Sequence, residues 1–506
     1  MAIFFPFNIF HGIFSCAAVA PLISLAFGTS TSASPPTPTR SSYDPVNRTP
    51  LLLTKICSRD ALTQRRGRAG RVREGICYKL LTKKLYESLN EHTTPEIERV
   101  ALDSTILTIK NMGFDGLLRT LISPPSRAAV DSALTSLKEV GAVDFNSGAI
   151  TSLGKLLALL PVSVCVGKMM VFGTLLGCRD IILTIAAGMT LQRSPFLKNL
   201  LPRKNARKRK AFLKYLHDDE LEEMGLLNLS DNEQDAEEDE DEARRRNIEE
   251  ERKKLLKQGG HSDHVMLAAA YDLWEKAQGN QQKRRICDRL GLSEAGMREF
   301  KTTRSQLDQN LSSALQRNRN DIDNRNCTEW RVVRTAIVSG LCPSGLVKVV
   351  KQVVKYEETA GGAVEKEATG KELKFFKKGD GGQMQRVFVH PSSPCFDVGN
   401  YSCPWLANFQ LVETSKPFLR DVSECTGFGL ALFGGELTVN IEQSVVVIGG
   451  FARLSCSPRV AMLILGVREA LDKVLQSKVD RRESTHANEV EAVMDVVTSL
   501  IVGEGL

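Results

Sequence analysis

The sequence predicts a multidomain α+β protein, and three observations support this class. The chain has 506 residues, enough for roughly three or four domains of about 100–200 residues each. Its apolar content of 42% is sufficient for packed cores. The hydrophobic period also changes along the chain, from helical spacing before about Gln316 to a period near two after Arg331. We therefore expect mainly helical domains first and a strand-rich domain later.

The first 50 residues are expected to form an apolar segment followed by a linker. Residues 1–39 carry no charged side chain, and residues 3–27 are strongly apolar. They could be a signal or anchor segment with a cleavage site at 31–34, which would make the chain a membrane-anchored or secreted interaction protein. The segment lacks the usual positive start and contains two prolines, so we favour a non-homologous start from alternative splicing or a mis-joined gene model. Residues 28–50 are rich in Ser, Thr and Pro, which is typical of a linker.

The cysteines and the charge balance indicate the compartment and the kind of partner. The 12 cysteines occur singly, without a CxxC pair or a Cys/His pair at zinc-ligand spacing. This favours reduced thiols in a cytoplasmic or nuclear protein and predicts no metal site. Outside the acidic run at residues 218–242, the chain has 67 basic and 46 acidic residues. A body this basic suits a polyanion such as nucleic acid, although solubility alone could explain part of the excess.

The strongest chemical signal is the segment Gln64-Arg65-Arg66-Gly67-Arg68-Ala69-Gly70-Arg71. Its arginines and glycines predict a loop that faces an anion. Guanidinium groups bind phosphate oxygens through paired hydrogen bonds, and glycines let the backbone approach closely. The alternative for the segment alone is an Arg/Gly-rich RNA-binding or import loop. Residues 75–81 follow as a plausible strand.

Residues 93–155 have the helix, helix, hairpin pattern of a winged helix. A first helix is expected at Thr93-Thr94-Pro95-Glu96, where a Thr cap, a proline and a Glu occur at the usual spacing. A second helix is expected at about 127–140, with apolar residues on one face. Residues 142–151 then surround an Asn-Ser-Gly turn, which predicts two short strands.

Residues 156–320 are expected to form a helical bundle. The apolar run at 162–191 is long enough to span a membrane, but three charges interrupt it, at Lys168, Arg179 and Asp180. Packed helices are therefore favoured over a membrane span.

A charged insertion at residues 203–258 interrupts this bundle. Six of the eight residues 203–210 are basic, and residues 218–242 hold 14 acidic side chains without Lys or Arg. Such blocks are typical of solvated, disordered segments or of one exposed helix. The basic cluster could also serve as a nuclear import signal or a nucleic-acid contact.

Residues 325–440 are expected to form a small β-barrel, and residues 441–506 a helical tail with two helices after Arg459. Short runs with a period near two, separated by Gly-rich turns, predict the barrel strands. These runs lie at 332–333, 336–338, 347–350, 373–376 and 387–389.

The order of these segments resembles the C-terminal half of the DEAH/DExH-box ATP-dependent RNA helicases. Segment 64–71 is similar to their last signature motif, QRxGRAGR. The resemblance covers about residues 54–500 without the insertion, and it fits the larger multidomain members. Later segments resemble family motifs in the same order: EHTTPEIER at 91–99, AITSLG at 149–154 with LPV at 160–162, SDHV at 262–265 with AYDLW at 270–274, RVFVHPSS at 386–393 and LFGGEL at 432–437.

The resemblance implies a remnant of the second RecA-like lobe at 51–92, a winged helix, a helical ratchet (HA2) bundle, an oligonucleotide-binding (OB)-like barrel and C-terminal helices. It places Gln64, Arg68 and Arg71 opposite the γ-phosphate of ATP, with Arg68 and Arg71 as catalytic residues. An arginine finger can contribute roughly 10³–10⁵ to the rate of phosphoryl transfer. For the parent helicase, the resemblance implies ATP and Mg²⁺ as cofactors, RNA as partner, and an activating protein on the barrel as a further candidate.

The resemblance also implies an RNA-facing element of the barrel at His390, Ser392 and Ser393. A histidine at a strand end with neighbouring hydroxyls suits a phosphate or a sugar, and a satisfied structural histidine is the alternative. Trp274 and Trp405 could stack on bases, although core packing is favoured.

The motor half of such a helicase is absent from this sequence. No GxxxxGK[ST] loop occurs to cradle phosphates, and the tetrad at 239–242 belongs to the acidic run. The leading hypothesis is a helicase portion that binds single-stranded RNA through ratchet and barrel, supplies the arginine edge of an ATP site and is inactive alone. The alternative is a non-catalytic RNA-binding or partner-docking protein derived from such a helicase.

Overall fold

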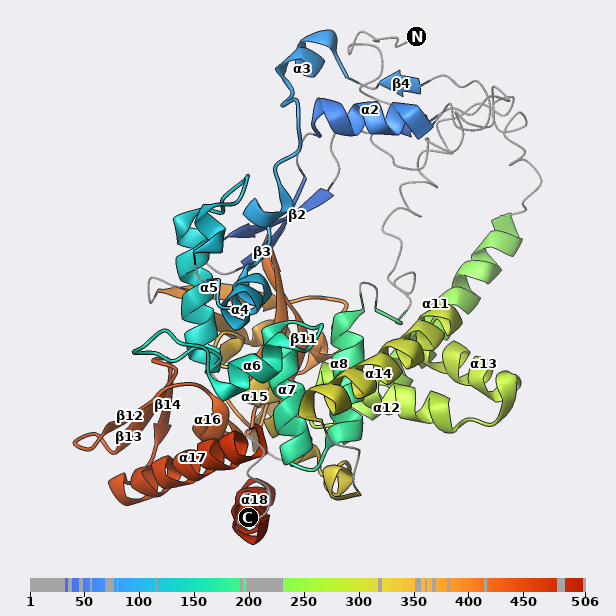
Figure 1. Ribbon diagram of the computed structural model, residues 1–506. Coiled ribbons are helices and arrows are strands. Elements are labelled where there is room, and N and C mark those ends of the chain that lie inside the picture. Colours follow the sequence, from blue (N-terminus) through green and yellow to red (C-terminus); the bar gives the residue numbers. More distant parts are fainter. Residues whose placement is uncertain are drawn as a thin grey trace. The chain divides into compact units, whose positions relative to one another are not determined.

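The computed structural model divides the chain into two units, and each is described by itself (Figure 1). The first is Met1–Leu102, Asp115–Ser132 and Val412–Ser415, and the second is Asp103–Phe114, Ala133–Leu411 and Lys416–Leu506. The structure describes residues 32–34, 39–44, 49–54, 57–68, 77–79, 81–114, 116–191, 194–196, 231–316, 321–350, 356–359, 362–365, 370–379, 383–413, 416–479 and 487–503.

The first unit is built from short strands and helices, in which η denotes a 3-10 helix. Its elements are β1 (Ser32–Ser34), β2 (Thr39–Asp44), β3 (Thr49–Thr54), α2 (Arg59–Arg68), β4 (Cys77–Lys79), α3 (Lys83–Ser88), η2 (Glu96–Glu98) and η3 (Leu117–Arg119). β2 and β3 form an antiparallel hairpin, and β1 pairs in parallel with β4. Within the linker expected at 28–50, residues 32–34 and 39–44 pair as strands. The strand expected at 75–81 is confirmed as β4, and residues 3–27 lie outside the described residues.

The helix expected to begin at Thr93 does not form there. Thr93 does not cap a helix, because its hydroxyl lies 2.6 Å from Ser58 Oγ and its amide donates to Asp60 Oδ2 at 3.3 Å. Only the single turn η2 follows, and it ends at Arg99, where φ is −131°. The first α-helix of this region is α4 (Asp103–Asn111), in the second unit.

The second unit continues with α5 (Arg127–Val140), which enters it at Ala133, and α6 (Ser152–Ala158). The apolar face expected for α5 is buried at Ala133, Leu137 and Val140. The expected hairpin after it is reduced to one antiparallel bridge, between Val143 and Ile150.

The turn of this hairpin follows its sequence, and it supports α6. Gly148 has the positive φ of +68° that an Asn-Ser-Gly turn requires. Gly154 lies in the first turn of α6, where a Cβ would come within 2.0 Å of the carbonyl oxygen of Ala142. Glycine therefore lets α6 rest directly on the hairpin backbone.

The apolar run at 162–191 forms two helices, α7 (Val164–Leu175) and α8 (Arg179–Thr190). In the part of the chain that the structure describes, no helix is both long and apolar enough to cross a membrane. The helices expected up to about Gln316 are confirmed as α12 (Asp263–Lys276), α13 (Gly279–Leu290) and α14 (Glu294–Leu315).

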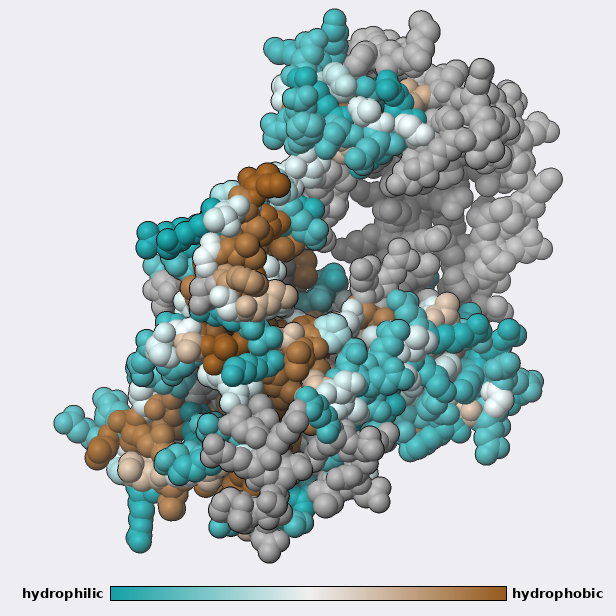
Figure 2. Space-filling model, viewed as in Figure 1, coloured by the Kyte–Doolittle hydropathy of each residue, from teal (hydrophilic) through white to brown (hydrophobic). Residues whose placement is uncertain are grey.

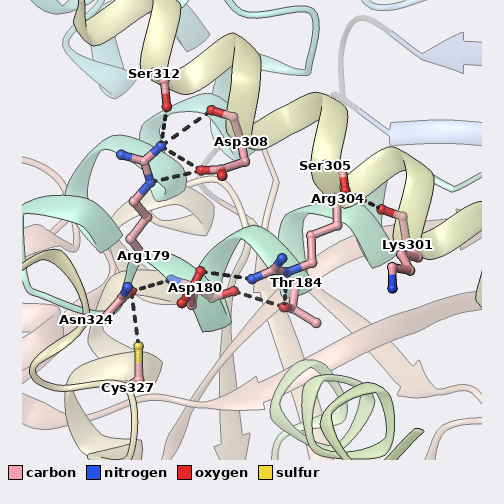
Figure 3. Close-up of polar contacts among 10 residues, drawn as sticks. All are labelled: Arg179, Asp180, Thr184, Lys301, Arg304, Ser305, Asp308, Ser312, Asn324 and Cys327. Atoms are coloured by element: carbon pink, nitrogen blue, oxygen red, sulfur yellow. Dashed lines mark hydrogen bonds and ion pairs between the residues drawn. The ribbon is translucent and has the colours of Figure 1, made fainter. Parts of the chain in front are cut away.

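Arg179, one of the charges that interrupt the apolar run, ties α8 to α14 (Figure 3). Its side chain is fully buried, and Nη2 donates to Asp308 Oδ1 and to Ser312 Oγ, both at 2.6 Å. Its Nη1 lies 3.5 Å from Oδ2 of Asp323, which belongs to η5 (Asp321–Asn324). We call Arg179 with these three partners the ratchet cluster.

Asp180 makes a second link between the same helices, in which the acid lies on α8 and the arginine on α14 (Figure 3). Arg304 of α14 donates to Asp180 Oδ1 at 2.9 Å and to Thr184 Oγ1 at 2.9 Å. Two of the three charges that argue against a membrane span, Arg179 and Asp180, are thus groups that bind α8 to α14.

The charged insertion contains one long helix, α11 (Asp231–Gln258). The second half of α11 packs on its neighbours through Ile248 and Leu256, which are each 3% exposed, while most of its other side chains are exposed. Arg252 Nε also donates to the carbonyl oxygen of Leu290, at the end of α13, at 2.9 Å. The expectation of disorder is therefore wrong for this part, whereas the basic cluster at 203–210 lies outside the described residues.

The strands expected at 332–333 and 336–338 are wrong, because these residues belong to the helix α15 (Trp330–Leu341). Nearly every side chain of α15 is buried, and a continuous apolar run does not reveal its own period. α15 packs closely on α7, where a Cβ at Gly340 would lie 2.5 Å from the carbonyl oxygen of Cys165.

The expected barrel follows α15, and its other expected strands are confirmed. The strand order is β11-β9-β8-β5-β10, and an additional pairing of β11 with β10 closes the ring. Valines and leucines of these strands fill its interior. The barrel elements are β5 (Leu346–Val350), β8 (Lys374–Lys378), β9 (Met384–Val389), β10 (Trp405–Glu413) and β11 (Pro417–Glu424), with the hairpin β6 (Tyr356–Thr359) and β7 (Gly362–Glu365) and the short helices η6 (Gly370–Glu372) and η7 (Pro394–Asp397).

The C-terminal region contains the two expected helices and a small sheet that the sequence analysis missed. The helices are α17 (Pro458–Val479) and α18 (Ala487–Val502). Before them come α16 (Gly427–Phe433) and the antiparallel sheet β12 (Leu437–Asn440), β13 (Val445–Ile448) and β14 (Ala452–Ser455). Figure 2 shows apolar residues gathered over this sheet and α17, where Ile441, Met462 and Leu463 are 69%, 65% and 66% exposed.

Candidate nucleic-acid interface

The arginine motif lies at the end of α2, whose start is held by a carboxylate. Asp60 Oδ1 accepts hydrogen bonds from the Ser58 hydroxyl and from the Ala61 amide. The Ser58 hydrogen bond is the main reason that the pKa of Asp60 lies below its usual value. The backbone amides of Arg59 and Asp60 donate to the carbonyl oxygens of Asn90 and Glu91. Residues 57–60 and 90–93 are therefore joined as one local structure.

The expected anion-facing loop is a helix in its first part. Residues 64–68 complete α2, because Gln and Arg are good helix formers and the single Gly67 is tolerated near a helix end. Gln64 is exposed, and no atom comes within 4 Å of a Cβ built at Gly67. The side chain of Arg68 and all of Arg71 lie outside the described residues. Their phosphate-binding and catalytic roles stay predictions.

The residues present do not make a complete ATP site. A nucleotide site of this kind needs a backbone cradle for the phosphates and a carboxylate for Mg²⁺. The sequence contains no GxxxxGK[ST] loop, and the described residues bring together no group of three or more metal-ligating side chains. The chain's own residues could supply only one side of such a site, through Gln64, Arg68 and Arg71.

The SDH segment at the start of α12 and the HPSS segment after β9 meet inside the second unit. Asp263 Oδ2 accepts hydrogen bonds from Ser393 Oγ at 2.6 Å and from the Val422 amide at 3.0 Å. Its Oδ1 accepts from the Cys395 amide at 3.3 Å. Burial raises the pKa of Asp263, and these hydrogen bonds act in the opposite direction. One buried carboxylate thus joins α12 to two segments of the barrel.

Ser262 and His264 extend this contact along β11. The hydroxyl of Ser423 lies 2.6 Å from Ser262 Oγ and 2.7 Å from His264 Nδ1. All three side chains are nearly or fully buried, and burial lowers the pKa of His264 to about 4. We call the buried group of Ser262, Asp263, His264, Ser393 and Ser423 the barrel junction.

Ser393 is therefore not at an RNA-facing surface. It is 9% exposed, and its hydroxyl is used by Asp263. The HPSS motif predicts a nucleic-acid contact here, together with His390 and Ser392. That placement fails because the chain turns inward at Ser393, which caps the start of η7.

His390 and Ser392 remain near the surface and contact each other. Ser392 Oγ lies 2.6 Å from His390 Nδ1, and the Ser392 amide donates to the same nitrogen at 3.1 Å. Because an amide can only donate, Nδ1 accepts from the Ser392 amide. Arg420 Nη2, which is also only a donor, lies 3.4 Å from His390 Nε2 on the other side of the ring. An imidazole, a guanidinium and a hydroxyl thus lie together, and such groups suit phosphate or sugar oxygens.

The two candidate tryptophans are core residues, which confirms the favoured interpretation of core packing over base stacking. Trp274 and Trp405 are each 3% exposed, so neither offers a face to a base.

Three family models match the chain in the order of these structural regions. They are the helicase associated domain (HA2), ratchet-like, at residues 163–267, the OB-fold at 333–437 and the C-terminal domain in RNA helicases at 444–503. The first covers most of the helical bundle, the second the barrel, and the third the C-terminal sheet and helices. The fold and these matches define the class: the domains that accompany an RNA helicase motor on its C-terminal side.

Three known proteins are similar to this chain over about nine tenths of its length. A putative DEAH-box ATP-dependent helicase of Mycosarcoma maydis is 29% identical over 92% of this chain and 29% of its own length. DExH-box ATP-dependent RNA helicase DExH1 of Arabidopsis thaliana is 26% identical over 91% of this chain and 40% of its own length. ATP-dependent RNA helicase DHX29 of Homo sapiens is 26% identical over 90% of this chain and 29% of its own length. The three domain matches and these relatives support a C-terminal half of a DEAH/DExH-box RNA helicase, and the chain spans about a third of the length of these relatives.

Proposed function

We propose that this chain is the RNA-binding, C-terminal part of an ATP-dependent RNA helicase, and that it holds single-stranded RNA with its ratchet and barrel. The observation that carries this is the group of polar side chains at His390, Ser392 and Arg420. The barrel junction fixes this group to α12, because Ser393, next to Ser392, and Val422, two residues after Arg420, both bond Asp263. A phosphate or ribose bound at the surface would therefore be held by a rigid support.

We further propose that Gln64, Arg68 and Arg71 supply the second-lobe edge of an ATP site in the parent helicase. Guanidinium groups there would stabilise charge that develops on the transferred phosphoryl group. The chain alone lacks a phosphate cradle, so we expect it neither to hydrolyse ATP nor to unwind RNA.

The test is RNA binding by the purified chain over a range of salt concentrations. We expect a fluorescent single-stranded RNA to bind at low salt. The logarithm of the binding constant should fall linearly with the logarithm of the salt concentration, with a slope of about −0.7 for each neutralised phosphate. Arg420→Ala should weaken binding. Arg298→Ala on α14, whose guanidinium already pairs with Glu294 at 2.8 Å, should not. Failure of the chain to bind RNA at low salt would reject the proposal.

ATP turnover by the same preparation tests the second part. RNA-stimulated hydrolysis above the level of an Arg68→Ala variant would show that the chain is active alone. Because the chain lacks a phosphate cradle, its RNA affinity should be the same with and without ATP. The alternative function is that of a non-catalytic RNA-binding or partner-docking protein. An activating protein that docks on the barrel is a further proposal, and its binding should survive Arg420→Ala.

A further inference from the structure

The outward face of the barrel carries alternating cations and phenylalanines on three neighbouring strands. The side chains between them point inward: Phe375, Val387, Val389 and Leu419 are at most 6% exposed. Because successive side chains of a strand alternate in direction, the intervening residues point outward. The outward residues are Lys374, Phe376 and Lys378 on β8, Met384, Arg386 and Phe388 on β9, and Lys416, Phe418 and Arg420 before and on β11.

Two of the phenylalanines lie side by side and are flanked by cations. Phe418 is the register partner of Phe388 in the parallel pair β11–β9, and their ring centroids are 6.3 Å apart. Arg386 and Lys416 approach the Phe388 ring to 5.2 and 5.0 Å. We call these four residues the barrel stripe. His390 adjoins it, with its ring 5.5 Å from that of Phe418.

The charge of this face differs from that of an ordinary solvated surface. On α13 and α14 several exposed cations pair with acids, as in Arg298 with Glu294 and Lys301 with Glu275. The nine outward residues of the three barrel strands include five cations and no acid. An acid first follows at the far end, where Asp421 comes after Arg420 with a positive φ of +55°. A face of one sign with half-buried rings is suited to a polyanion that also carries rings.

The free energies of the two kinds of contact show whether a base could replace the cations on the phenylalanine rings. A cation over an exposed aromatic ring contributes about 0.5–1 kcal/mol. Stacking of a base on an aromatic side chain contributes about 1–3 kcal/mol per base. Arg386 and Lys416 are exposed, so they can move from the ring to a neighbouring phosphate at little cost.

We propose that the barrel stripe is a stacking site for single-stranded nucleic acid. Two unstacked bases lie on Phe388 and Phe418, and Arg386 and Lys416 neutralise the phosphates between and beside them. The site requires splayed bases, so a duplex, whose bases are already stacked, does not use it. This inference rests on the proposed function and adds the residues on which the bases stack.

The experiment compares binding of a short fluorescent oligouridine by the full chain and by paired variants. Phe388→Leu with Phe418→Leu keeps apolar side chains but removes the aromatic faces. We expect a loss of affinity of about 10-fold or more with an unchanged salt slope, since stacking of two bases is removed. Arg386→Ser with Lys416→Ser should instead reduce the salt slope by about 1.4, or 0.7 for each phosphate.

The matched control is Phe145→Leu. Phe145 is 65% exposed and has Lys138 Nζ 5.3 Å from its ring, so it reproduces one ring with one cation away from the barrel. Its replacement should leave oligouridine affinity unchanged. A second readout uses 2-aminopurine in the oligonucleotide, whose fluorescence should change on binding to the parent chain and not to the Phe388/Phe418 variant. Equal thermal unfolding of all variants excludes misfolding as the cause.

The outcomes separate the two proposals. No binding of oligouridine by the parent chain at low salt rejects the proposed function itself. Binding that is unaltered in the Phe388/Phe418 variant rejects the stripe and leaves the function intact. Equal loss for a duplex RNA also rejects it, because a duplex cannot stack on the rings. An acidic, tyrosine-containing peptide that competes as well as oligouridine of equal charge would identify a protein ligand and overturn the assignment to nucleic acid.

Discussion

The ratchet cluster and the barrel stripe use arginine in opposite ways. Arg179 is fully buried between helices and faces the carboxylates of Asp308 and Asp323. Arg386 is exposed and lies over an aromatic ring on a face without acids. A buried charge is tolerated only with partners, whereas an exposed surplus of one sign stays available to an outside partner. The signs of the neighbours therefore separate a structural arginine from a binding one.

The largest effect is expected from breaking the ratchet cluster. Arg179→Met leaves Asp323, whose side chain is 4% exposed, buried without its cation. Removal of one partner of a buried pair costs about 3–5 kcal/mol, so the free energy of unfolding in urea should fall by that amount. Lys301→Ala, which removes an exposed pair with Glu275, should cost less than about 1 kcal/mol. Equal losses in the two variants would contradict the assignment.

The barrel junction should give the next largest effect, as a dependence of stability on pH. Burial lowers the pKa of His264 to about 4, below its ordinary value of 6.5. The unfolded chain then binds a proton more readily than the folded chain, so stability falls as pH falls from about 6.5 to about 4. The total is about 3 kcal/mol, from 1.36 kcal/mol per pKa unit.

Unfolding in urea across this range measures that effect, and His264→Gln should remove it. The control is His92→Gln, at a side chain that is 79% exposed, which should keep the full pH dependence. A His264→Gln profile parallel to that of the parent chain would show that other groups cause the change.

Two adjacent serines repeat the comparison at a smaller scale. Ser393 is inside the barrel junction, and Ser392 lies at the surface beside His390. Ser393→Ala should lower the free energy of unfolding by about 1–2 kcal/mol, because a buried hydrogen bond is lost, and should leave RNA affinity near that of the parent. Ser392→Ala should change stability by less than about 0.5 kcal/mol and weaken RNA binding. A reversed pattern would mean that the two serines are wrongly assigned.

The smallest effect on stability is expected in the barrel stripe. Arg386→Ser should change the free energy of unfolding by less than about 0.5 kcal/mol, since it removes only an exposed contact. The salt slope of RNA binding should decrease by about 0.7, because one phosphate loses its cation. A clear loss of stability without a change in slope would make Arg386 a structural residue like Arg179.

The hydrophobic periodicity of the sequence was sufficient to predict much of the fold. The helices of the bundle and the tail, several barrel strands and the burial of Trp274 and Trp405 follow from local pattern. α15 could not be recognised, because a helix buried on all sides has no polar face to set its period. The small C-terminal sheet was missed for a related reason, since its strands are only four residues each.

The candidate site was less accessible to sequence reasoning. The same motif predicted both Ser392 and Ser393 as nucleic-acid contacts. Only the contact of Ser393 with Asp263, which is distant in sequence, distinguishes the buried serine from the exposed one. The barrel stripe could have been found, because KFFKK, MQRVFVH and KPFLR alternate cations and aromatics at strand spacing. Which of these strands are neighbours, and therefore which rings meet, depends on barrel closure and is not written in any one segment.

The carboxylate of Asp263 has a consequence for the dynamics of the second unit. The amides of Cys395 and Val422, 27 residues apart in sequence, both donate to it. Both amides are held by this carboxylate, and that of Cys395 also lies 3.1 Å from Ser393 Oγ. We expect the two to exchange slowly and at one shared rate, when α12 separates from the barrel. The start of α12 and these barrel segments would then open as a single cooperative unit, and any motion transmitted through α12 would carry the barrel with it.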